Sequence, residues 1–165
     1  MSLDGRYRIG ASSRLEVTAR APGHDFVAKG AALGGSVRFE NGALVELSAE
    51  ANLADLAGSD PIGTHELRKF VGADRRPTIR GSLMGPAPLS DRGTSYSGMG
   101  VVRFVAPTGK VAEVQVTLSG RPEACLGTFK TSFSALGYTP PKLLFLKVRD
   151  ELEVRVELSL TKELP

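Results

Sequence analysis

The sequence predicts an all-β protein whose antiparallel strands close into an up-and-down barrel of about eight strands, with one short helix. The segment 151–161 alternates polar and apolar residues without a break, which is typical of a strand with one wet face and one buried face. The same alternation recurs along most of the chain between turn residues. Because closure removes exposed strand edges, this pattern favours a barrel, with a strongly curved sandwich as the alternative.

The first third of the chain contains a series of short strand patterns separated by turn residues. Pro22-Gly23 ends one such run, and Asn41-Gly42 is the strongest hairpin signal in the chain. After that turn, apolar and polar residues alternate for about ten residues, which predicts a long strand. The expected strands are 7–9, 14–19, 24–29, 35–40 and 43–53.

One segment breaks the β pattern. Asp60 stands in an N-cap position and Pro61 at the first helical position, ahead of Leu67, Phe70 and Val71 at helical spacing. We therefore expect one short helix that ends near Val71. Strands resume after it, separated by turns that contain Gly or Pro, and are expected at 77–84, 94–106, 110–119, 127–136 and 152–160.

Composition limits the class of protein. The chain has 165 residues and predicts a single globular domain over 1–165. Its net charge of +3 is spread along the strands, which argues against a nucleic-acid partner. There is no apolar run long enough to span a membrane, so no stable insertion is expected, and the chain as written is expected to be cytoplasmic. A periplasmic location is the alternative, if Met1-Ser2-Leu3 replaces a signal segment. The single Cys125 is expected to be buried and inert.

Several motifs share their order with a known family. They are the opening segment 4–9 (DGRYRI), the segment 65–70 (HELRKF) followed by 76–79 (RPTI), and the ending 131–138 (TSFSALGY) before a final amphipathic strand. In this order they resemble the YceI-like proteins over nearly the whole chain. The resemblance implies a bacterial, extended lipocalin-like barrel of eight antiparallel strands with a helix at its side. It also implies an elongated apolar pocket, which in some members holds a polyisoprenoid chain.

The chain departs from that family pattern at three places, so it resembles a divergent member. Segment 10–13 (GASS) stands where a His-Ser pair is usual, Gly63-Thr64 stands near the place of an Arg-Asp pair, and 130–137 (KTSFSALG) replaces an Asn-Arg-Ser-Asp-Phe-Gly run. The fold tolerates such changes. A specific ligand does not transfer with them, because the shape inside a barrel depends on every inward side chain.

A barrel of about eight strands has an interior that side chains fill or that holds one small ligand. Small residues on strand faces favour a hollow interior, and they are Ala49, Ala51, Gly98, Gly100 and Ala106. The alternative is that they only permit tight strand coiling around a packed core. Apolar residues of the later strands and the helix are the candidate ligand-binding residues, namely Leu67, Phe70, Tyr96, Phe104, Phe129, Phe133, Val154, Val156 and Leu158.

Catalytic and metal-binding patterns are lacking, so we expect no catalytic residue, no cofactor and no metal. His24 and Asp25 are neighbours on a strand and point to opposite faces, and His65 and Glu66 do not face each other on a helix. Two histidines without nearby cysteine fall short of zinc-site spacing. No nucleophile elbow, phosphate-binding loop or dinucleotide fingerprint is found.

Two further segments carry surface hypotheses. The basic run Asp74-Arg75-Arg76 is a solvated loop or a site for an anionic head group at the barrel mouth. The apolar run 143–146, between Lys142 and Lys147 and after Pro140-Pro141, is a strand buried on both faces or a loop that caps the barrel. If exposed, it would form a patch for a membrane or a partner, which vesicle binding by Leu144→Asp tests.

The favoured function is a non-enzymatic binding or carrier protein for an apolar or amphiphilic molecule of the polyisoprenoid or isoprenoid-quinone type, held inside the barrel. One alternative is an enzyme acting on such a ligand with His24 or His65 as general base. A second is a packed barrel that acts as a protein-interaction module through its outer surface. A homodimer is one candidate for the assembly state.

Overall fold

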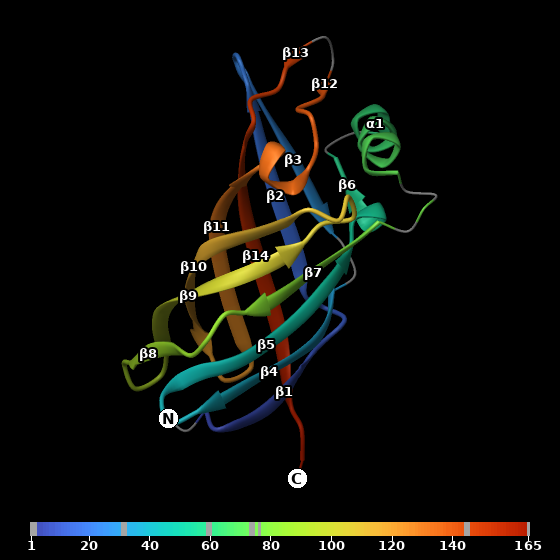
Figure 1. Cartoon of the computed structure of the whole chain (residues 1–165). Coiled ribbons are helices and arrows are strands. Elements are labelled where there is room, and N and C mark those ends of the chain that lie inside the picture. Colours follow the sequence, from blue (N-terminus) through green and yellow to red (C-terminus); the bar gives the residue numbers. More distant parts are fainter. Residues whose placement is uncertain are drawn as a thin grey trace.

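Twelve strands of the chain form one antiparallel sheet that closes on itself (Figure 1). The computed structural model describes residues 3–30, 33–58, 61–72, 75, 77–143 and 146–164. The strands of the sheet are β1 (Gly5–Ile9), β2 (Arg14–Ala21), β3 (His24–Gly30), β4 (Leu33–Glu40), β5 (Ala43–Asn52), β6 (Leu56–Ala57), β7 (Thr78–Leu83), β8 (Ala87–Asp91), β9 (Tyr96–Val105), β10 (Val111–Arg121), β11 (Ala124–Ser132) and β14 (Glu151–Lys162).

Elements outside this sheet gather near one end of the barrel. The helix α1 (Pro61–Val71) packs beside β6 and the short 3-10 turn η1 (Leu53–Asp55). Another 3-10 turn, η3 (Ser134–Leu136), and the paired short strands β12 (Lys142–Leu143) and β13 (Leu146–Lys147) lie at the same end. Both chain termini lie at the opposite end (Figure 1). We call these the α1 end and the terminal end.

The wall is an eight-stranded barrel, as the sequence predicts. Its twelve segments reduce to eight because successive pairs continue one another as bent strands: β1 with β2, β3 with β4, β5 with β6, and β7 with β8. The long strand β14 closes the barrel, since its first half pairs with β2 from Leu152↔Ala19 to Glu157↔Arg14 and its end pairs with β1 at Leu160↔Ile9.

Local sequence explains the tightest connection. Asn41 and Gly42 both have positive φ, 51° and 75°, which is the backbone of a type I′ turn. This turn has the twist that joins two adjacent antiparallel strands, and β4 and β5 pair directly on either side of it, at Glu40↔Ala43. The predicted hairpin is thus confirmed.

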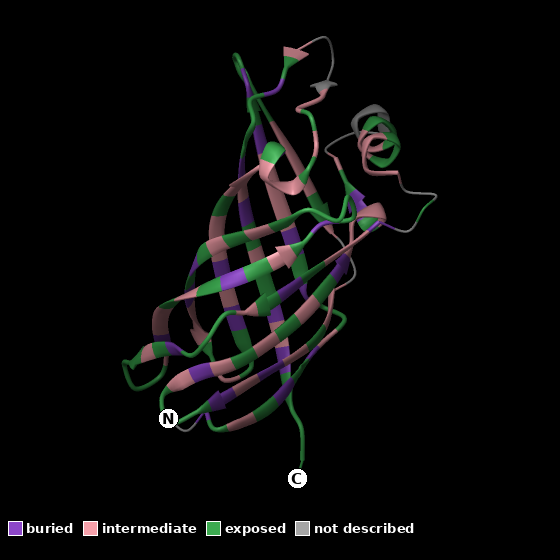
Figure 2. Cartoon of the chain, in the orientation of Figure 1, coloured by how far each residue is buried: buried purple, intermediate pink, exposed green. Residues whose placement is uncertain are grey.

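The terminal end of the barrel is filled by aromatic side chains. The ring of Phe39 lies edge-on to Tyr7, with centroids 5.5 Å apart, and to Tyr96, at 5.6 Å. These three side chains are only 2–3% exposed. Buried residues run along the inward faces of the strands there (Figure 2). Packed rings of this kind close the interior at this end.

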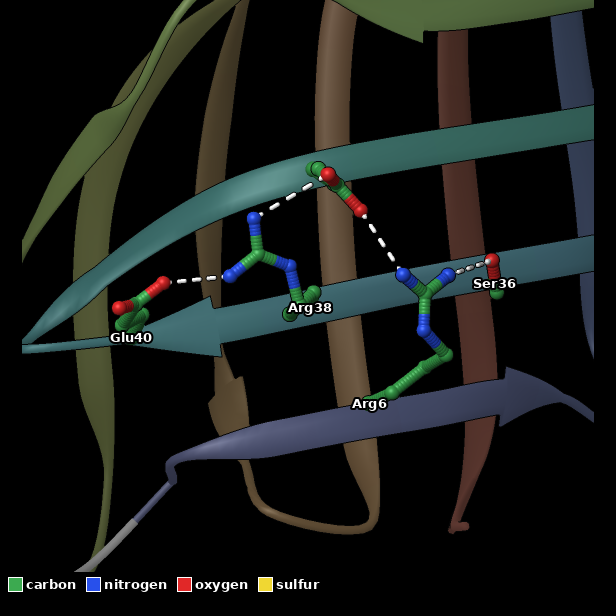
Figure 3. Close-up of polar contacts among 5 residues, drawn as sticks. Arg6, Ser36, Arg38 and Glu40 are labelled. Carbon is green, nitrogen blue, oxygen red and sulfur yellow. Dashed lines mark hydrogen bonds and ion pairs between the residues drawn. The ribbon is translucent and has the colours of Figure 1, made fainter. Parts of the chain in front are cut away.

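The outer face of the terminal end carries ion pairs between strands (Figure 3). Arg38 of β4 contacts Glu40 and also donates to Glu46 of β5 at 3.1 Å. Arg6 of β1 donates to the other carboxylate oxygen of Glu46, also at 3.1 Å. The hydrogen bond from Arg38 lowers the pKa of the Glu46 carboxyl. All four side chains are at least a third exposed, so the network contributes little stability.

The predicted elements agree with the structure for α1 and for most strands, with two corrections. The strand expected at 94–106 begins at Tyr96, and a separate strand, β8, precedes it. Pro88 within β8 concealed that strand in the sequence, because proline is rare inside sheets. The strand expected to reach residue 136 ends at Ser132, where the N–H groups of Phe133 and Ser134 turn to Asp150.

Candidate functional site: an apolar cavity inside the barrel

The α1 half of the barrel is hollow. Inward-facing Phe104 and Phe129 are only half-buried, although they belong to a closed wall, whereas the inward aromatic residues at the terminal end are almost fully buried. A cavity of about 270 Å³ accounts for this difference. Its lining is almost wholly apolar, as expected for a site that binds a hydrophobic molecule.

Strand alternation builds this lining. On β11 every second residue points inward, so Gly127, Phe129 and Thr131 line the cavity while Thr128 and Lys130 do not. On β14 the inward residues are Leu152, Val154, Val156 and Leu158. The rings of Phe104 and Phe129 stack across the intervening β10, with centroids 5.1 Å apart, and form one continuous aromatic surface.

The helix and η3 border the cavity at its open side. Leu67, Phe70 and Val71 turn one face of α1 toward the interior. Phe70 joins α1 to the segment around η3, since its ring lies 5.7 Å from that of Phe133 and 5.3 Å from that of Tyr138.

Eight of the nine predicted liners lie around the cavity, and they are Leu67, Phe70, Phe104, Phe129, Phe133, Val154, Val156 and Leu158. Tyr96 does not line it, because its ring is packed into the terminal end against Phe39. Tyr96 also faces inward, and it differs from the eight liners in its height along the barrel. Whether the eight bind a ligand stays a prediction.

The small residues have two different roles, one of which corrects the prediction. Ala49 and Ala51 of β5 line the cavity and leave space, as expected. Gly98 and Gly100 do not, since a Cβ on Gly98 would lie 2.4 Å from the Pro88 carbonyl oxygen and one on Gly100 would lie 3.0 Å from Ala87. These glycines let β8 approach β9 closely. Ala106 is buried away from the cavity.

Sequence reasoning missed several polar and turn residues of the site. Thr131 lies two positions after Phe129 on the same face, so strand periodicity could have identified it. Leu136 ends η3 and Tyr138 follows it, and no periodic pattern applies there. The η3 turn ends at Gly137, whose φ of 82° is left-handed, and Tyr138 then donates its N–H to the Phe133 carbonyl oxygen at 2.8 Å. This turn brings the Tyr138 ring back to the cavity.

The two histidines occupy different places. His24 is exposed at the rim of the cavity, where its ring lies edge-on to Phe26 at 4.6 Å. Its neighbour Asp25 instead pairs with Arg20 at 2.8 Å. His65 is exposed on α1 and does not line the cavity. Among the residues that the structure describes, neither histidine has a carboxylate partner, so no acid-base pair is assembled at the cavity.

The remaining surface predictions fall partly outside the described residues. Asp74 and Arg76 of the basic run, the helix-capping Asp60, Met1 and Ser2 of the opening, and Leu144 and Phe145 of the apolar run lie there. Arg75 is exposed and donates its N–H to the Gly72 carbonyl oxygen at 2.9 Å. The described parts of this run, Lys142–Leu143 and Leu146–Lys147, pair with each other as β12 and β13 and do not belong to the sheet of the barrel wall.

The described residues also bear on metal binding, membrane crossing and thiol reactivity. Within the described ranges, no three His, Cys, Asp or Glu side chains come together as a metal site. No helix in this part of the chain combines the length and apolarity needed to cross a bilayer. Cys125 is buried, and desolvation raises the pKa of its thiol, which keeps it protonated and unreactive.

The closed eight-stranded wall, the side helix and the apolar interior define a lipocalin-like barrel. Among solved structures, the chain is similar to the crystal structure of Burkholderia cenocepacia BcnA, with a TM-score of 0.63 and 15% identity. The match covers 93% of this chain and 99% of that one, so the likeness extends to the whole barrel and shows a shared fold. No family model matches the chain, and neither does any curated protein sequence.

Proposed function

We propose that this protein is a non-enzymatic binder or carrier of an elongated apolar or amphiphilic molecule, which it holds inside the α1 half of the barrel. The observation that carries the proposal is the contrast between the two ends of one interior. The terminal end is filled by Tyr7, Phe39 and Tyr96, while Phe104 and Phe129 in the other half border open apolar space.

Burial of an apolar chain supplies the binding energy. Each buried methylene contributes about 0.8 kcal/mol, so ten contribute about 8 kcal/mol. Association costs about 4–15 kcal/mol in lost motional freedom. Chain length therefore decides whether binding is useful, and affinity should rise with length until the cavity is filled. This favours a long flexible chain over a short compact molecule.

An isoprenoid-like occupant is proposed from the resemblance of the sequence motifs to the YceI-like proteins. The structure has a compatible shape. Its interior runs from α1 toward the rings of Tyr7, Phe39 and Tyr96, which we call the aromatic plug, and branched side chains such as Val154 and Val156 line it along β14. Asp25, the neighbour of His24, pairs with Arg20 and not with the imidazole, which supports binding without chemistry.

A length series tests this proposal. N-phenyl-1-naphthylamine serves as a neutral fluorescent probe for the cavity, and geraniol, farnesol and geranylgeraniol compete with it. We expect the Kd to fall at least tenfold from the ten-carbon to the fifteen-carbon alcohol, and the alcohols to be recovered chemically unchanged. Length-independent or undetectable binding would contradict the proposal, and a modified alcohol would favour the enzyme alternative, with His24→Ala as the variant to test next.

A further inference from the structure

The polar groups of the cavity are confined to one end. Thr131, Tyr138 and His24 all lie toward α1, and Glu66 of α1 completes the set of polar side chains at the rim. The other half of the lining is apolar, with Leu47, Val116, Leu118 and Leu158 among its residues. An amphiphile therefore enters with its tail toward the aromatic plug and leaves its polar end beside Thr131 and Tyr138.

The charges that the described residues bring to this end do not favour an anion. Among the described residues no lysine or arginine lines the cavity, and the one carboxylate turned to the rim is that of Glu66. The other acidic lining residue, Glu50, belongs to the outer face, where its exposed side chain pairs with Arg80 at 3.5 Å. Arg68 and Lys69 of α1 are exposed and do not line the cavity. An unpaired anion buried here would lose its hydration without gaining a counter-charge.

Uncharged hydrogen-bonding groups are present instead. Thr131 Oγ1 and Tyr138 Oη are buried, and neither has a hydrogen-bond partner among the described residues. Burial raises the pKa of the Tyr138 phenol, so this group keeps its proton and can donate it. In this structure both oxygen atoms are covered. Because Thr131 lines the cavity, rotation about χ1 would bring its hydroxyl to the interior. A ligand oxygen would then satisfy a group that is costly to leave unpaired.

We infer that the cavity selects amphiphiles whose polar end is uncharged, with a hydroxyl or carbonyl oxygen that hydrogen-bonds to Thr131 and Tyr138, and that it rejects phosphate, diphosphate and carboxylate ends. This inference rests on the proposed function and narrows its ligand class. For the basic run Asp74-Arg75-Arg76 it favours the solvated-loop alternative over a site for an anionic head group.

Three compounds with the same fifteen-carbon chain test the inference by displacement of N-phenyl-1-naphthylamine. They are the hydrocarbon farnesene, the alcohol farnesol and the anion farnesyl diphosphate. We expect farnesol to bind at least tenfold more tightly than farnesyl diphosphate. If farnesene and farnesol bind and the diphosphate binds as tightly as farnesol, this inference alone is wrong. If none of the three displaces the probe, the proposed function fails together with it.

Isosteric variants assign the two hydroxyls. Thr131→Val and Tyr138→Phe remove one oxygen atom each and keep the shape of the side chain. Each should weaken farnesol about three- to tenfold and leave farnesene unchanged, because only the alcohol has a hydrogen bond to lose. Thr128→Val, on the outer face of the same strand, is the matched control and should change neither. Equal effects on both compounds would assign Thr131 and Tyr138 a packing role only and overturn their part in the inference.

A charge reversal at the rim provides a gain-of-function test. Glu66→Lys places a cation beside the cavity, and we expect it to tighten farnesyl diphosphate at least fivefold at low ionic strength while farnesol changes less than twofold. Glu163→Lys makes the same charge change near the terminal end and should have no such effect. Similar tightening by both variants would show that net charge, and not the rim, controls anion binding.

Discussion

Ser13 holds the point at which β14 changes its partner strand: its Oγ accepts a hydrogen bond from the Ser159 N–H at 2.9 Å. Apart from two tyrosines and Cys125, Ser13 is the one buried polar side chain among the described residues, with 1% of its surface exposed. On the first half of β14 the neighbour is β2, and on its end the neighbour is β1. Gly10 donates its N–H to the Ser159 carbonyl oxygen at 2.7 Å, so both backbone groups of Ser159 are satisfied across the kink.

Removal of that hydroxyl should be costly. Ser13→Ala leaves the half-buried Ser159 N–H without an acceptor, which should lower the free energy of unfolding by about 1–3 kcal/mol. Urea unfolding followed by circular dichroism measures the change. Ser12→Ala, at the exposed neighbouring position, is the control and should stay within about 0.5 kcal/mol of the parent protein. Equal stability of the two variants would show that the kink does not depend on Ser13.

Close strand approach at Gly98 predicts an asymmetric response to alanine. Gly98→Ala puts a Cβ 2.4 Å from the Pro88 carbonyl oxygen, a backbone atom, so we expect a loss of about 1–3 kcal/mol in the same unfolding assay. At Gly34 no atom lies within 4 Å of the place that an added methyl group would take, and Gly34→Ala should be neutral or stabilising by up to about 1 kcal/mol. A harmless Gly98→Ala would mean that β8 does not lie against β9 as described.

A larger side chain at Ala49 should fill the cavity. Ala49→Phe projects a ring into the open half of the barrel, so farnesol should bind at least tenfold more weakly, because the ring occupies the space of the chain. The free energy of unfolding should not fall, since filling a cavity adds contacts. Ser48→Phe places the same ring on the exposed face of the same strand and should leave farnesol binding unchanged. Unaltered binding by Ala49→Phe would place the ligand elsewhere.

Stability should fall as the pH rises through the range in which a cysteine thiol ordinarily loses its proton. Desolvation raises the pKa of this thiol in the folded state above its ordinary value of about 8.5. The folded state therefore keeps the proton that the unfolded state loses, and stability is full below about pH 8.5 and declines above it, by at most about 1.4 kcal/mol per pH unit. Urea midpoints between pH 7 and 9.5 measure the slope. Cys125→Ala should flatten it, and an unchanged slope would contradict this assignment.

The sequence predicted the wall of the barrel well because the alternation of apolar and polar residues in each strand indicates its buried face. Alternation along 151–161 and along 43–53 corresponds to β14 and β5, and the Asn41-Gly42 turn fixed β4 as one neighbour of β5. These signals depend on adjacent residues alone, so no tertiary information was needed. The helix 61–71 was likewise predictable from Pro61 and the spacing of Leu67 and Phe70.

The position of the cavity was less accessible to sequence reasoning. Tyr96 and Phe104 stand on the same face of β9, yet one packs into the aromatic plug and the other borders the cavity. Their difference is one of height along the barrel axis, which the register of neighbouring strands determines. Tyr138 reaches the cavity only through the turn at Gly137, and Gly98 serves a strand, β8, that Pro88 concealed. Such features depend on long-range packing.

The most direct test of the central claim is native mass spectrometry of the purified protein, followed by solvent extraction and identification of any bound small molecule. The proposed function predicts one amphiphile per chain with a long apolar tail, and the further inference predicts an uncharged polar end on it. A bare protein mass that stays unchanged after incubation with farnesol and geranylgeraniol would contradict the carrier function and favour a barrel that acts through its outer surface.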